Sequence, residues 1–186
     1  MDKRLKKAVA LSMMLAIAIV LNLVETQITF FIPVPGAKLG LANIVTIIIL
    51  YTFGFKEAFV VAVLRVVIAS LLSPGRFLAP PFYMALAGGI LSVLVMAVFR
   101  KINFFGVSGT SLFGSIAHVL GQVAVGYFLI GEGLFVWLPL MMILGIITGF
   151  IIGLIARQFL KTTKDWFSKE LLNPKEKKKE NNSEHS

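Results

Sequence analysis

The composition of this 186-residue chain excludes an ordinary soluble domain. Of its residues 58% are hydrophobic and only 15% are charged, and the mean hydropathy is +0.90, whereas soluble domains are about 25% charged. The net charge of +9 gathers at the two ends and in short connections, which is typical of topology determinants and not of a nucleic-acid-binding face. The chain has no cysteine, which excludes disulfides, thiolate metal sites and cysteine nucleophiles.

The N-terminus combines a basic start with an apolar run over residues 8–24, as a signal peptide does. This run is longer than the usual h-region of about 7–15 residues, and no A-x-A cleavage site follows it. We therefore expect a retained first helix that spans the membrane.

Long apolar blocks predict six transmembrane helices, because crossing a hydrocarbon core of about 30 Å takes about 20 helical residues. The expected spans are residues 6–25, 39–53, 56–72, 81–99, 111–130 and 135–159. The predicted fold class is therefore all-α, a polytopic six-helix bundle over residues 1–162. The charged, low-complexity segment 163–186 is expected to be a basic, disordered cytoplasmic tail.

The distribution of lysine and arginine predicts the orientation. If the N-terminus lies inside, the outside segments hold only Lys38 and Arg76, and all other basic residues of the ends and connections lie inside, apart from Arg65 within a helix. The positive-inside rule then places both termini in the cytoplasm.

Two stripes of small residues recur every four positions, a spacing that lets helix backbones approach closely in lipid. They are Ala8, Ser12 and Ala16 on the first helix, and Gly145, Gly149 and Gly153 on the last. Such a stripe serves either packing within the chain or docking of a partner subunit. The sequence leaves both alternatives open.

Arg65 is the clearest polar anomaly, because about nine residues of helix place it near the middle of the membrane. It needs an anionic or carbonyl partner there. One interpretation is an ion pair with Glu25, near the outer end of the first helix, or capping by backbone carbonyls. The other is that its guanidinium faces a substrate anion, since its planar fork suits carboxylate or phosphate.

Further polar residues are expected in the outer half of the bundle. His118 and Gln122 lie four apart and share one helix face; they are either hydrogen-bonded struts or the lining of a polar cavity. Asn43 is expected near the outer end of the short second helix, and Lys38 precedes that helix. Lys38 either contacts a ligand or extends to lipid headgroups. These residues, with Arg65 and Glu25, are the candidate substrate-binding site.

Several catalytic motifs are missing. The two aspartates lie in or beside the tails, so no D-D-x-x-D can hold Mg²⁺-diphosphate, and no metal-ligand cluster is visible. There is no P-loop, G-x-S-x-G or H-E-x-x-H motif. The sequence therefore predicts a non-enzymatic protein without a metal or other cofactor.

One long stretch, "PVPGAKLGLANIVTIIILYTFGFKEAFVVAVLRVVIASLL", resembles a bacterial membrane family labelled heptaprenyl diphosphate synthase component I, also called the Gx transporter family. The P-x-P-G-x-K-L-G-L-A-N motif, the F-K-E-A connection and the L-R arginine carry the resemblance, together with "AGGILSVLVMA" and "GSIAHVLGQ". It covers roughly residues 5–160.

The two family names imply different functions. The second implies a fold similar to the substrate-binding subunits of energy-coupling-factor transporters, which bind a small solute outside and dock on a transmembrane coupling subunit and two ATPases. Those subunits typically dock through an A-x-x-x-A stripe, of which Ala8, Ser12 and Ala16 are a version with serine in the middle. The first name implies a role in prenyl-diphosphate or quinone synthesis. A subunit of a membrane redox complex is the remaining alternative.

Overall fold

The computed structural model describes residues 3–30, 40–102 and 105–166. Over these residues it contains six α-helices and one 3₁₀ helix and no strand, so the all-α prediction is confirmed. The elements in chain order are α1 (Lys3–Phe30), α2 (Asn43–Thr52), α3 (Phe55–Leu71), α4 (Pro80–Ile102), α5 (Gly106–Ile130), η1 (Glu132–Trp137) and α6 (Leu138–Trp166).

Helix ends differ from the sequence prediction by a few residues. Helix α1 continues to Phe30, and near its end the hydroxyls of Thr26 and Thr29 donate to helix carbonyls four residues earlier, at 2.8 and 2.9 Å. The last helix begins later than residue 135, since the six residues before Leu138 form the tighter η1. The ends therefore shift without a change in the number of helices.

Among the described residues, four helical segments are long and apolar enough to cross a membrane: Arg4–Thr29, Pro80–Ile102, Gly106–Ile130 and Glu132–Thr163. Four of the six predicted spans therefore meet this criterion, and α2 and α3 do not. Helix α2 has only 10 residues, about 15 Å at about 1.5 Å per residue. That is roughly half of a hydrocarbon core of about 30 Å. The chain is therefore an all-helical, membrane-type protein that contains one half-length helix.

Helix α2 lies at the centre of the bundle and packs against α1, α3, α4, α5 and α6. Its Ile47, Ile49 and Leu50 are fully buried. Because every face of α2 is covered by protein, its polar first residue, Asn43, is also held inside the bundle. This placement brings α2 to the candidate site.

Glycine makes the contacts of α4, α5 and α6 close. A Cβ on Gly149 would lie 2.6 Å from Cβ of Ser115, and a Cβ on Gly153 would lie 2.7 Å from Cα of Ser108, both on α5. A Cβ on Gly145 would lie 3.0 Å from Cγ2 of Val119, also on α5. The glycine stripe of α6 therefore packs against this chain's own α5, as close helix approach through small residues allows.

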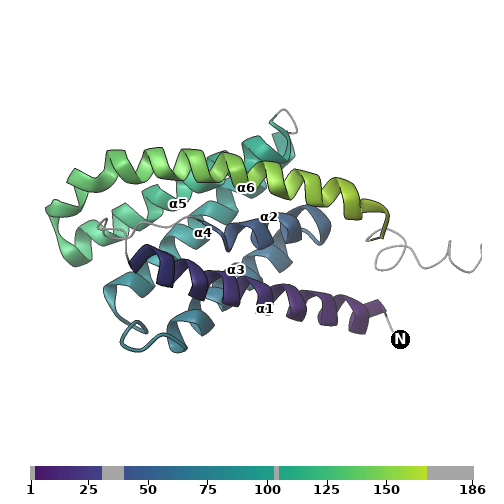
Figure 1. Cartoon of the computed structure of the whole chain (residues 1–186), viewed down its shortest axis with the longest axis horizontal. Coiled ribbons are helices and arrows are strands. Elements are labelled where there is room, and N and C mark those ends of the chain that lie inside the picture. The colour runs from purple at the N-terminus through teal and green to yellow at the C-terminus, as the bar shows by residue number, and fades with distance from the viewer. Residues whose placement is uncertain (1–2, 31–39, 103–104, 167–186) are drawn as a thin grey trace, which may run out of the picture.

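Helix α1 lies at the edge of the bundle, mainly against α3 and α2 (Figure 1). Only 11% of the residues in its most apolar stretch are buried inside the bundle. Ala8, Ser12 and Ala16 are all exposed, so this second stripe is not used for packing within the described chain. Its face is available to lipid or to a partner.

The start of α1 and the end of α6 lie at the same end of the bundle (Figure 1). Polar links join the elements there. Lys7 of α1 forms an ion pair with Glu57 of α3 at 2.5 Å. Arg100 of α4 donates a hydrogen bond to the carbonyl of Leu50 in α2 and lies over the ring of Tyr51. This basic end is opposite the candidate site.

Candidate functional site

The site is built around Arg65, which α3 places inside the bundle with only 3% of its surface exposed. Its Nη2 donates a hydrogen bond to Oδ1 of Asn43 at 2.7 Å. Its Nε is buried and has no hydrogen-bond partner among the residues that the structure describes. A buried guanidinium that leaves a donor unused is costly without a further partner, so this donor can still accept a polar partner such as water.

Glu25 of α1 lies beside this arginine but does not bond to it. It is 4% exposed, and its Oε1 accepts a hydrogen bond from the backbone N–H of Gly40 at 2.5 Å. Gly40 has a φ of +74°, which is readily accessible only to glycine. The ion pair considered between Arg65 and Glu25 is therefore replaced by two separate hydrogen bonds around one space.

That space is a cavity of about 10 Å³, enough for about one water molecule. Helices α1 to α5 all contribute to its wall. The lining residues are Asn22, Glu25, Gly40, Ala42, Asn43, Arg65, Val66, Ala85 and His118. The cavity thus has the polar lining from several helices that the sequence predicted, but it is closed around a very small volume.

His118 and Gln122 of α5 are placed differently. His118 is 6% exposed and lines the cavity. Gln122 is 1% exposed and does not line it. Both side chains lie against Gly88 of α4: a Cβ there would come within 2.8 Å of Gln122 Cγ and 3.1 Å of His118 Nε2. Gly88 therefore provides the room that these two polar side chains occupy.

Lys38 is the remaining predicted site residue, and Tyr83 lies on α4. Lys38 lies outside the described residues, and its proposed role stays a prediction. Tyr83 is 40% exposed, packs edge-on against Phe82 and is not part of the cavity wall. The aromatic ring therefore lies at the surface of the bundle.

Arg76, in the connection between α3 and α4, is a neighbour that sequence reasoning did not include in the site. Its Nη1 donates to Oγ1 of Thr26 at 2.6 Å, and Thr26 in turn donates to the carbonyl of Asn22. Burial lowers the pKa of Arg76, and the charge of Glu25 raises it; the guanidinium stays protonated. The sequence did offer one signal for Arg76, because it is one of only two basic residues assigned to the outside segments.

The two buried or partly buried glutamates of the helices, Glu25 and Glu57, lie far from each other in the fold. Glu25 lies in the cluster, whereas Glu57 is paired with Lys7 at the opposite end of the bundle. In the described parts of the chain, no three His, Cys, Asp or Glu residues group as metal ligands. The cluster can orient and neutralise an anion through arginine and amide donors, and it offers no second carboxylate for metal-bridged diphosphate chemistry.

The fold and this cluster define a polytopic, all-helical membrane protein with a buried arginine site. Residues 14–159 match the family model described as heptaprenyl diphosphate synthase component I. The chain belongs to that family. No curated protein and no solved structure matches it.

Proposed function

We propose that this chain is the solute-binding subunit of a membrane importer of the energy-coupling-factor type, with the Arg65 cluster as its binding site. In this account the chain binds and releases a small solute and performs no chemical reaction. The observation that carries the proposal is the buried Arg65 with its unused Nε, in a cavity to which five helices contribute. Ionisable residues inside a membrane bundle are expensive and usually serve such a site.

The chemistry of the wall favours an anionic solute. The guanidinium of Arg65 offers parallel donors that match a carboxylate or phosphate, and Asn43 and His118 add hydrogen-bonding groups. Glu25 limits this preference, because its carboxylate lines the same cavity and would repel an anion unless it pairs with a cationic group of the ligand. A solute with both an acidic group and a hydrogen-bond donor fits this wall best.

Binding requires the cavity to widen, since it now holds about one water molecule. Helix α1 is the element best suited to move, because it is the least buried of the membrane-spanning helices. It carries Asn22 and Glu25 into the wall. A small displacement of α1 from α2 and α3 would open the cluster without disturbing the tightly packed α4, α5 and α6.

Partner docking forms the second part of the proposal. The exposed Ala8, Ser12 and Ala16 form a face on which a transmembrane coupling subunit could pack, in turn bound to cytoplasmic ATPases. The end of the bundle that carries the start of α1 and the end of α6 would face the cytoplasm, as the positive-inside rule predicts. Since docking and the site share α1, partner binding can alter the cavity.

The family description supports a second candidate: an accessory membrane component beside another component of a heptaprenyl diphosphate synthase. The chain would then recruit or position that partner without supplying catalytic groups. Incubating the purified chain with allylic diphosphate and Mg²⁺, alone and with a soluble synthase, tests this candidate. A rate increase that depends on this chain would favour it. A structural subunit of a redox complex, with the polar cluster as an internal strut, is the third alternative.

The deciding experiment is purification from native membranes, followed by mass spectrometry of bound small molecules and copurifying chains. The importer account predicts a small polar solute together with coupling and ATPase subunits. Copurification of a prenyl synthase component without such a solute would instead support the accessory role.

A further inference from the structure

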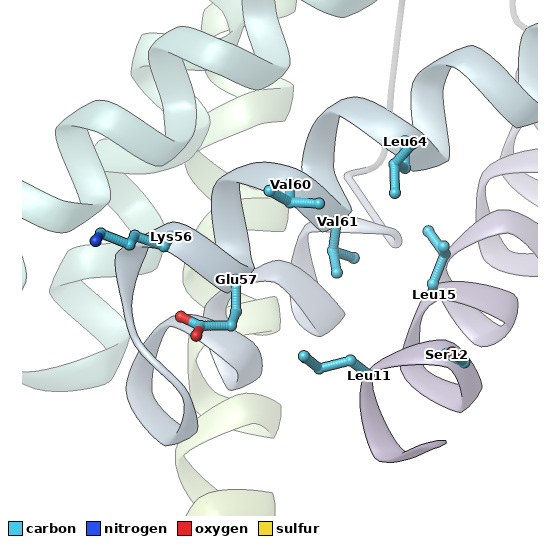
Figure 2. Close-up of a pocket in the computed structure, with 8 residues that line it drawn as sticks. All are labelled: Leu11, Ser12, Leu15, Lys56, Glu57, Val60, Val61 and Leu64. Atoms are coloured by element: carbon cyan, nitrogen blue, oxygen red, sulfur yellow. The ribbon is translucent and has the colours of Figure 1, made fainter. Parts of the chain in front are cut away.

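A second cavity lies on the surface of the bundle between α1 and α3, away from the Arg65 cluster. It has a volume of about 300 Å³. Its walls are formed by Leu11, Ser12 and Leu15 of α1 and by Val60, Val61 and Leu64 of α3 (Figure 2). Val60 and Leu64 are exposed, so this groove opens sideways, toward the surrounding lipid.

One end of the groove is charged. Lys56 and Glu57 line it there. The carboxylate of Glu57 is already paired with Lys7 at 2.5 Å, whereas the exposed Lys56 has no acidic partner within 4.0 Å among the described residues. The charges of Lys7 and Glu57 cancel, so Lys56 supplies the surplus positive charge.

The length of the groove along α3 corresponds to part of one membrane leaflet. From Lys56 to Leu64 it extends about 12 Å along α3, at about 1.5 Å per residue. This is less than half of a hydrocarbon core of about 30 Å. An apolar channel that begins at a cationic rim and ends inside one leaflet has the shape of an amphiphile with an anionic head.

We propose that this groove binds one molecule of anionic phospholipid from the leaflet on the basic side of the bundle. One acyl chain lies between Leu11 and Leu15 of α1 and Val60 of α3. The phosphate lies beside Lys56. This proposal is independent of the solute proposed for the Arg65 cluster.

Charge and shape favour a lipid over a partner helix in this groove. Its apolar floor meets a net positive rim, which complements an anionic headgroup. Of the three small residues on the exposed α1 stripe, only Ser12 lines the groove, and Ala8 and Ala16 do not. A helix that packed along that stripe would therefore share only Ser12 with the groove.

The test uses the full chain in nanodiscs of phosphatidylcholine with one tenth phosphatidylglycerol, followed by native mass spectrometry. The wild-type protein should retain one phosphatidylglycerol. Lys56→Gln should lower the preference for phosphatidylglycerol over phosphatidylcholine about five-fold, the effect of about one lost surface cation. Lys101→Gln, at an exposed lysine on α4 outside the groove, is the matched control and should retain the wild-type preference.

The apolar part is tested separately. Val60→Trp should fill the groove and abolish retention of the lipid, whereas Val98→Trp, at an exposed valine of α4, should not. Size-exclusion profiles check that each variant is folded. Equal retention by wild type, Lys56→Gln and Val60→Trp would overturn the proposal. A photo-crosslinker at Leu64 in native membranes should yield a phospholipid adduct, and an adduct with a protein chain would also overturn it.

Discussion

Nη2 of Arg65 donates to Oδ1 of Asn43 at 2.7 Å, which links the middle of α3 to the first residue of α2. This hydrogen bond joins a buried charge to the buried amide of a helix that is too short to cross the membrane. It also directs the arginine toward the cavity, where its Nε is unused. The pair therefore both holds α2 in place and prepares the cluster for an acceptor.

Replacing Asn43 with alanine should destabilise the protein, because Nη2 of Arg65 would lose its acceptor inside the bundle. Leaving one buried partner unsatisfied costs about 1–3 kcal/mol, and more for a charged group. Thermal unfolding in detergent measures the loss. Asn43→Asp keeps an oxygen acceptor and should be closer to wild type; equal losses for alanine and aspartate would contradict the role of this hydrogen bond.

Gly88 and Gly89 are a matched pair on α4. A Cβ on Gly88 would lie 2.7 Å from the carbonyl oxygen of His118, whereas on Gly89 the nearest atom is Cγ2 of Val66 at 3.9 Å. Gly88→Ala should therefore force α4 and α5 apart and cost about 1–3 kcal/mol. Gly89→Ala should leave the unfolding temperature close to wild type. Similar temperatures for both variants would show that Gly88 is not needed for this contact.

Replacing Gly153 with alanine should change the stability of the protein and not its binding to a partner. A Cβ at this position would lie 2.7 Å from the backbone of Ser108 in α5, so Gly153→Ala should lower the unfolding temperature. Gly133→Ala, where nothing lies within 4 Å, is the control for loss of glycine. If Gly153→Ala kept full thermal stability but lost copurifying chains, the α6 stripe would be an interface.

The opposite result is expected for the α1 stripe. Ala16→Leu adds bulk to an exposed position, so it should leave the unfolding temperature unchanged and reduce the copurification of coupling subunits. Val98→Leu, at an exposed position of α4, controls for added bulk on the surface of the bundle. Unchanged copurification with Ala16→Leu would remove the stripe from the proposed interface.

The number of helices could be predicted from the sequence because each helix lies in its own apolar block, and such blocks have few alternatives in a membrane. The length of α2, only 10 residues, was not predicted. The α6 stripe illustrates the limit of this reasoning. Small residues at a spacing of four indicate a close helix contact, but they do not identify the other helix. Only the structure shows that Gly149 and Gly153 meet α5.

The polar lining of this cavity was predictable as a set of residue types, and its contacts were not. Arg65, Glu25, Asn43 and His118 do line one cavity, because each is a polar residue that the apolar exterior would reject. The partner of Arg65 depends on helix rotation and on the path of the chain into α2. Gly40, whose N–H bonds Glu25, could not be recognised, since its contribution is a backbone group.

The most direct measurement compares the bound small molecule in wild-type protein and in Arg65→Gln, both purified from native membranes and analysed by native mass spectrometry. Arg157→Gln, an exposed arginine on α6, is the control for lost charge, and size-exclusion profiles verify folding. We predict that wild type and Arg157→Gln carry the same small polar solute and that folded Arg65→Gln carries none. Equal occupancy in folded Arg65→Gln would contradict the assignment of this cluster as the binding site.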